Sequence, residues 1–193
     1  MADADLGNRR TLIALAFLFL GPLAVAWTLY LTGLWRPGAG VNHGELIQPV
    51  ILLPRNEQPT VDGGVTEGGY LYGKWTLVHL ADENCDELCR LSVVKTRQIR
   101  LAMGREIDRI DRVLFLHNAP NPEFGAEQPD LLVVSPTGAA GGQIVDALNA
   151  NGGAGQIFLV DPLGNLILSY PQDGDPADIR DDLKKLLRLS RIG

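Results

Sequence analysis

Cysteine, histidine and positive charge are all scarce in this chain. Its 193 residues include two cysteines and three histidines, and acidic residues outnumber basic ones by 23 to 17, which gives a formal net charge of −6. Two cysteines cannot form a scaffold of several disulfides. An acidic chain also lacks the basic surface that general nucleic-acid binding requires. These scarcities exclude a cysteine-rich mini-protein and argue against a nucleic-acid partner.

Charge is also missing locally, from the segment Thr11–Trp35. As a helix these residues would span about 37 Å, which exceeds the ~30 Å hydrocarbon core of a bilayer. We therefore predict a transmembrane anchor at residues 11–35, behind a short N-terminus of residues 1–10. Arg9 and Arg10 precede the anchor, and the positive-inside rule places that N-terminus in the cytoplasm. A single apolar run excludes a multi-span transporter.

A cleaved signal peptide is the alternative interpretation of this segment. Ala24-Val25-Ala26 has the small-residue pattern of a cleavage site, so cleavage after Ala26 stays open. Against cleavage, the apolar run continues for nine more residues and carries Trp27, Tyr30 and Trp35, which are typical of a membrane interface. Both versions deliver the following domain to the same oxidising compartment.

The remaining chain has the composition of one ordinary globular domain. Residues 36–72 are rich in glycine and proline, which indicates a tether and an edge element around Leu46–Leu53. Residues 73–193 alternate between patterns typical of strands and of helices, which predicts an α/β fold with a mixed, mostly parallel sheet flanked by helices. The expected strands are 74–80, 112–117, 131–135, 156–160 and 166–170, and the expected helices are 85–103, 142–150 and 175–191.

The two cysteines, Cys85 and Cys89, lie four residues apart between the first of these strands and the first helix. On a helix face that spacing brings the side chains together, so two thiolates could share a metal ion. A disulfide would need some adjustment of the first turn. Two soft ligands suit Cu(I), whereas thiol–disulfide exchange needs only the pair. A purely structural disulfide and two free buried thiols are the alternatives.

The pattern also distinguishes between the two sulfurs. Cys85 lies nearer the start of the expected helix, where the helix dipole favours a thiolate, so we expect it to be the attacking cysteine. The neighbouring Asp86 and Glu87 act in the opposite direction, because nearby negative charge disfavours a thiolate.

Several segments together resemble the Sco/SenC family. They are the anchor, the stretch GKWTLVHLADENCDELC, and IFLVDPLGN followed by a final helix. NHGELIQP and the ending DDLKKLLRLSRIG resemble the small Sco-like proteins associated with cytochrome oxidase assembly in proteobacteria. The family's members are membrane-anchored, thioredoxin-fold proteins that take part in copper delivery to cytochrome c oxidase. The resemblance implies a thioredoxin-like fold for residues 73–193, and Cys85 and Cys89 as copper ligands.

Two positions depart from the family pattern. Asp86 stands where the family usually has proline, and Asn151–Gly155 holds no histidine where the family's histidine ligand lies. Among the three histidines of this chain, His117 is the candidate metal ligand, because it ends the second expected strand near the cysteine loop. His79 and His43 are weaker candidates, since a lone histidine is more often structural than ligating.

The resemblance and the residues together predict a single-pass protein of the bacterial inner membrane, with its domain in the periplasm. It would assist cytochrome c oxidase assembly by binding and delivering Cu(I), or by reducing the copper-site cysteines of an oxidase subunit through the CxxxC pair. One alternative is a general periplasmic thiol-disulfide oxidoreductase that acts on another thiol protein. The other is an anchored interaction domain whose disulfide is purely structural.

Overall fold

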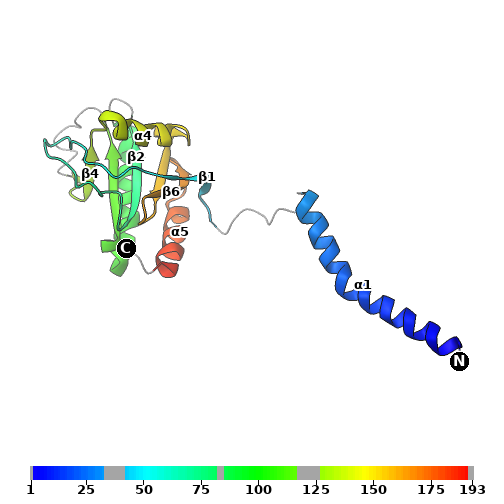
Figure 1. The fold of residues 1–193 in the computed structure, drawn as a ribbon. Coiled ribbons are helices and arrows are strands. Elements are labelled where there is room, and N and C mark those ends of the chain that lie inside the picture. The colour runs from blue at the N-terminus through cyan, green and yellow to red at the C-terminus, as the bar shows by residue number, and fades with distance from the viewer. Residues whose placement is uncertain (1, 33–41, 82–84, 117–126, 191–193) are drawn as a thin grey trace. The chain divides into compact units, whose positions relative to one another are not determined.

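The computed structural model describes residues 2–32, 42–81, 85–116 and 127–190, and the chain divides into two compact units, Met1–Val41 and Asn42–Gly193 (Figure 1). The first unit contains the helix α1 (Ala2–Thr32). Within α1, the stretch Arg9–Thr32 is long and apolar enough to cross a membrane. The hydroxyls of Thr28 and Thr32 donate to backbone carbonyls one turn earlier, at 2.7 Å each, so both are satisfied without water.

The second unit is built on a six-stranded sheet with the order β1-β6-β5-β2-β3-β4. Its central strand β2 is buried at every position, as the run of apolar residues predicts. The edge element expected around Leu46–Leu53 is β1, the outermost strand. The strands are β1 (Glu45–Leu52), β2 (Trp75–Leu80), β3 (Ile110–Phe115), β4 (Leu131–Val134), β5 (Gln156–Val160) and β6 (Asn165–Pro171).

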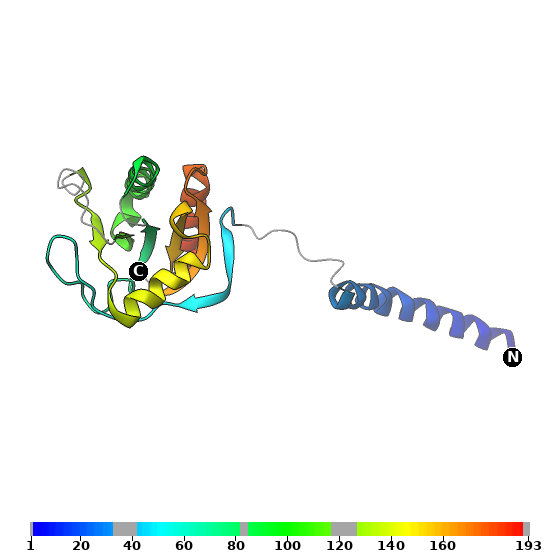
Figure 2. The ribbon, with the colours of Figure 1, turned by 90° about the horizontal axis from the view of Figure 1, so that it is seen from above.

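Helices cover both faces of this sheet (Figure 2). The helices α2 (Glu87–Ala102) and α5 (Pro176–Leu189) pack on one face, where Ile99 and Leu183 bury against Leu77. The helix α4 (Gly138–Asn149) covers the other face, where Leu148 joins Val78 in a second core cluster. The short 3₁₀ helices η1 (Gly104–Arg109) and η2 (Gly153–Gly155) follow α2 and α4, respectively. The fold is thioredoxin-like, as expected.

The balance of strand directions differs from the expectation of a mostly parallel sheet. The pairs β2–β3 and β3–β4 are parallel, but β2–β5, β5–β6 and β6–β1 are antiparallel. Alternating strands and helices give parallel pairs only when each helix returns the chain to the same end of the sheet. Here α4 carries the chain from the edge strand β4 to the far side of β2, and β5 enters in the reverse direction.

The helix boundaries follow from the capping residues. Asp175, the first residue of the helix expected at 175–191, caps α5 by accepting a hydrogen bond from the Ala177 amide at 2.8 Å, with Pro176 in the first turn. In contrast, α2 begins at Glu87 rather than at Cys85, because Asp86 is its N-cap. The helix α4 begins at Gly138, four residues before the expected start.

The buried carboxylate of Asp182 holds the beginning of the second unit in place through hydrogen bonds. The Oδ2 atom of Asp182, on α5, accepts hydrogen bonds from the backbone amides of His43 (2.8 Å) and Gly44 (3.0 Å) and from the Tyr170 hydroxyl (3.0 Å). Gly44 is required at this point, since a Cβ there would lie 2.5 Å from the Tyr170 ring. The chain that leads into β1 is therefore held against α5 by one side chain.

Replacing Asp182 with alanine should lower the free energy of unfolding by about 2–4 kcal/mol, because the buried Gly44 amide, the partly buried His43 amide and the buried Tyr170 hydroxyl lose their acceptor. The Asp182→Asn variant keeps one oxygen acceptor and should lose less. Urea unfolding of the full chain in mild detergent, followed by tryptophan fluorescence, measures both values. An alanine variant as stable as the wild type would contradict this role.

Candidate thiol site

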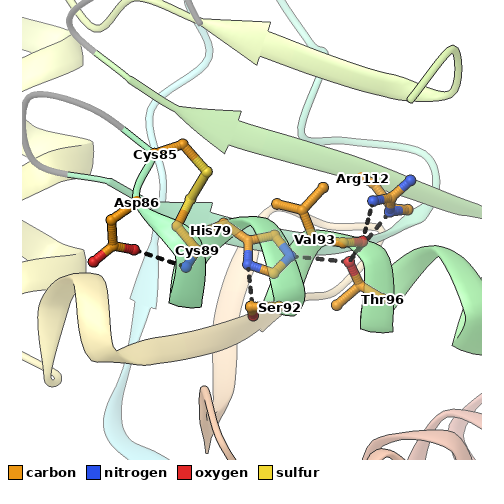
Figure 3. Close-up of a disulfide and its surroundings, with 8 residues drawn as sticks. All are labelled: His79, Cys85, Asp86, Cys89, Ser92, Val93, Thr96 and Arg112. Atoms are coloured by element: carbon orange, nitrogen blue, oxygen red, sulfur yellow. Dashed lines mark hydrogen bonds between the residues drawn. A yellow bond between two sulfur atoms is a disulfide. The ribbon is translucent and has the colours of Figure 1, made fainter. Parts of the chain in front are cut away.

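The cysteine pair lies at the corner between β2 and α2, and it forms a disulfide with a Cα–Cα distance of 5.2 Å (Figure 3). Cys85 lies two residues before the first residue of α2, whereas Cys89 lies within its first turn. The regular hydrogen-bond ladder of the helix therefore holds Cys89 but not Cys85. This freedom of Cys85 explains how two cysteines four residues apart reach the short separation that a disulfide requires.

The helix cap fixes the position of Cys89 further. The Asp86 carboxylate accepts a hydrogen bond from the Cys89 amide at 2.9 Å, so Asp86 satisfies one of the open amides at the helix start. Asp86 stands where proline is usual in the resembled family, and in this chain its side chain has a capping role. Both sulfur-bearing residues are largely buried, with 9% of Cys85 and 5% of Cys89 exposed.

The cysteine pair packs against apolar residues. Cys85 and Cys89 belong to a buried cluster that combines the end of β2, the middle of α2 and the strands β3 and β4. The disulfide therefore packs against an apolar cluster. The remaining buried members of the cluster are Ala81, Val93, Leu114, Leu116 and Val133.

An open groove of about 460 Å³ runs beside the turn that carries Cys89. Leu88 and Leu91 of α2 line it and are exposed, at 61% and 59%. Lys95 closes one part of the groove by donating to the carbonyls of Gln172 and Gly174, at 2.7 Å each. The groove also includes Gly155, in the segment where the resembled family carries its histidine ligand.

The structure does not bring His79 or His43 to the sulfurs as a ligand. His79 is buried, and both of its ring nitrogens are engaged: Nδ1 with the Ser92 hydroxyl (3.3 Å) and Nε2 with the Thr96 hydroxyl (3.0 Å). His43 lies at the start of the second unit, with its Nδ1 3.2 Å from the Asp178 carboxylate. His117, the candidate ligand, lies outside the described residues.

Burial lowers the pKa of His79 to about 3, and the nearby charges of Arg112 and Lys95 act in the same direction. The unfolded chain binds this proton near pH 6.5, so between these two pKa values the unfolded state holds more protons than the folded state. The stability contributed by neutral His79 should therefore be lost as the pH falls from 6.5 toward 3, at about 1.4 kcal/mol per pH unit.

Unfolding free energies at pH 7, 6 and 5 check this prediction. The difference between the wild type and the His79→Asn variant isolates the His79 contribution from that of the carboxylates, and we expect it to shrink as the pH falls. Protonation of the His79 ring near pH 6.5 in the folded protein, observed by NMR, would contradict the assignment.

The sequence did not predict the hydrogen bonds among several buried polar residues near the site. Arg112 is 1% exposed and donates to the Thr96 hydroxyl (3.2 Å), to the Val93 carbonyl, to Gln128 and to the Asp130 carboxylate (3.0 Å). Two signals were present: an arginine and a histidine inside otherwise apolar strands, and Ser92 and Thr96 spaced four apart on a helix. Neither signal identifies which helix residue is the hydrogen-bond partner of which strand residue.

Within the described residues, no three His, Cys, Asp or Glu side chains are arranged to hold a metal ion. The donor set that these residues offer is therefore the two sulfurs of the cysteine pair. When reduced, two thiolates form a soft, low-coordinate site of the kind that Cu(I) accepts. The same pair can exchange electrons with another disulfide without any metal.

No curated protein matches this sequence, but solved structures do. ScoI of Bradyrhizobium japonicum with copper bound is 18% identical, with a TM-score of 0.54 over 70% of this chain and 99% of that one. Yeast Sco1 with copper bound is 13% identical, with a TM-score of 0.58 over 79% and 96%. BsSco, a member of the Sco family of cytochrome c oxidase assembly proteins with a disulfide switch, is 17% identical, with a TM-score of 0.51 over 75% and 99%.

These matches confirm the structural resemblance to Sco proteins, and at such identities they establish the fold. A family model gives the stronger assignment, because it matches the sequence itself over residues 75–190. That stretch runs from β2 to the end of α5 and includes both cysteines. The chain therefore belongs to the family described as the transmembrane-like, thioredoxin-like, C-terminal domain.

Proposed function

We propose that this chain is a membrane-anchored Sco-like protein that reduces the copper-site cysteines of a cytochrome c oxidase subunit through Cys85 and Cys89. The observation that carries the proposal is the disulfide at the β2–α2 corner of a thioredoxin-like domain. In the sequence this domain follows a helix able to span a membrane. Structural likeness to Sco proteins, one of which has a disulfide switch, supports the same role. We place the anchor in the bacterial inner membrane and the domain in the periplasm.

The proposed reaction begins with the reduced pair. The Cys85 thiolate attacks one sulfur of the client disulfide, which forms a mixed disulfide and releases the first client thiolate. The Cys89 thiolate then attacks Cys85, which closes the Cys85–Cys89 disulfide and releases the second client thiolate. Two electrons pass to the client, and the two protons of the starting thiols end on the client thiols. A dithiol protein of the same compartment must then reduce the pair again.

The surroundings of the pair fit this sequence of steps. Cys85 precedes the helix and is the more exposed of the two, which suits the attacking residue, whereas Cys89 is held by the helix and by Asp86. A client segment can approach along the groove beside Leu88 and Leu91. In contrast to a general oxidoreductase, this proposal predicts a preference for the oxidase subunit over an unrelated disulfide protein.

Reduction of the oxidised copper-binding domain of an oxidase subunit by the full chain tests the proposal. We expect two client thiols to appear for each pair of Cys85 and Cys89 thiols consumed, as counted on each protein separately by thiol alkylation and mass measurement. A Cys85→Ser/Cys89→Ser double variant is the matched control and should release none. Equal rates with an unrelated disulfide peptide would instead favour a general oxidoreductase.

Carriage of Cu(I) is the second candidate function. It is favoured by the two sulfurs and by the shared fold with Sco structures that carry copper. In this candidate, copper is cargo that the reduced pair receives and passes to the oxidase subunit.

Competition for Cu(I) against a coloured chelator separates the two candidates. A copper carrier should bind one Cu(I) per reduced chain, and either single Cys→Ser variant should lose this binding. His79→Leu should retain it, because both His79 nitrogens are occupied by α2 hydroxyls. No binding by the reduced wild type would leave thiol exchange as the function.

A further inference from the structure

A chain of buried polar side chains runs beneath α2, beginning one turn after Cys89 (Figure 3). It joins Ser92 to His79, His79 to Thr96, Thr96 to Arg112 and Arg112 to Asp130. The first four of these residues are at most 2% exposed. Polar groups at this depth are costly unless paired, so the chain indicates a specific role next to the cysteine pair.

The directions of these hydrogen bonds can be assigned from the available donors. The Thr96 hydroxyl has one hydrogen, which it donates to the Val93 carbonyl at 3.0 Å. Thr96 must therefore accept from the Arg112 Nε–H, and also from His79, whose Nε2 carries the hydrogen. In this tautomer Nδ1 of His79 is an acceptor, and the Ser92 hydroxyl donates to it.

His79 therefore connects the strand that precedes Cys85 to the helix that carries Cys89. It lies on β2, the strand that leads to Cys85 six residues later, and it contacts α2, the helix that carries Cys89. Ser92 lies three residues after Cys89, on the same buried side of α2. In the oxidised protein the disulfide fixes the distance between the two sulfurs, but in the reduced protein that distance depends on the backbone between Cys85 and Cys89 and on noncovalent contacts.

We propose that His79 is a positioning residue that lowers the reduction potential of the pair by holding the Cys89 turn of α2 against β2 through Ser92. Contacts that keep the two thiols close in the reduced protein raise their effective concentration, and this favours disulfide formation. Loss of such a contact loosens the reduced form and makes the disulfide easier to reduce. This inference rests on the proposed redox function of the pair.

Equilibration of the full chain with glutathione buffers tests the inference. Replacing His79 with leucine should raise the equilibrium constant for reduction about tenfold, which corresponds to ~30 mV for this two-electron couple. Ser92→Ala should shift it in the same direction. His79→Asn, which places an amide oxygen near the position of Nδ1, should remain within about threefold of the wild type.

Leu148→Ala is the matched control, because Leu148 packs on the opposite face of the sheet in a different core cluster. It should destabilise the fold without changing the equilibrium with glutathione. A His79→Leu or Ser92→Ala equilibrium within twofold of the wild type would overturn the inference, as would an equal shift in Leu148→Ala. The proposed function is judged on the wild type's reaction with the oxidase subunit, so either idea can fail alone.

Discussion

Replacing Cys89 with serine should trap the chain in a covalent complex with its client. In the proposed reaction Cys85 forms the mixed disulfide and Cys89 resolves it, so without Cys89 the complex persists and turnover falls by about 10³-fold or more. The structure supports this order, since Cys85 precedes α2 and is more exposed than Cys89. Non-reducing gel electrophoresis after mixing the reduced variant with the oxidised oxidase domain detects the complex.

The Cys85→Ser variant is the control for this trap. It loses the attacking sulfur and should be equally inactive, but it should accumulate no mixed disulfide. If Cys85→Ser accumulates the complex and Cys89→Ser does not, the order of attack is the reverse of the proposed one. If neither variant forms a complex, while the wild type still reduces the client, the proposed pathway is wrong.

Removing the guanidinium of Arg112 should have the largest effect on stability. Arg112→Met should lower the free energy of unfolding by about 3–5 kcal/mol, because the change removes one hydrogen-bond donor from each of the buried acceptors on Thr96, Val93 and Gln128 and takes the buried cation away from Asp130. Asp130→Asn should cost less, because Asp130 is partly exposed and keeps polar contacts with other arginines. Urea unfolding gives both values, and an Arg112→Met variant within 1 kcal/mol of the wild type would contradict this account.

The ion pair between Arg112 and Asp130 should make the stability of the fold sensitive to acid. Burial alone would raise the pKa of Asp130, but the hydrogen bond and charge of Arg112, with the charge of Arg100, outweigh burial and hold the pKa below 3.8. A carboxylate with a depressed pKa contributes stability above its unfolded value and loses it as the pH falls through the folded value. Acid unfolding of Asp130→Asn should therefore show a smaller loss of stability below pH 4 than the wild type.

Local patterns predicted most of the elements correctly. The apolar run of β2 and the Asp175-Pro176 helix start were confirmed, because each depends on residues adjacent in sequence. The turn between β5 and β6 also depends on neighbouring residues, since the Asp161 carboxylate accepts hydrogen bonds from the amides of Leu163 and Asn165 at 2.9 Å. These features require no knowledge of distant partners.

The remaining features depend on contacts between segments that lie far apart in sequence. The direction of β5 follows from where α4 crosses the sheet, which no local pattern contains. His79 appeared as a weak metal candidate, because its partners Ser92 and Thr96 become visible only when α2 packs on β2. The disulfide depended on Cys85 lying outside the helix, and this followed from Asp86 acting as the cap.

The reduction potential of the Cys85–Cys89 pair in the full chain tests the central claim most directly. A pair that exchanges electrons with client cysteines should have a reduction potential between those of glutaredoxin and thioredoxin, roughly −200 to −270 mV. Equilibration with glutathione buffers, followed by thiol alkylation and mass measurement, gives the value. A potential below about −300 mV, together with no reduction of the oxidase subunit, would contradict the account and leave the disulfide a structural bridge.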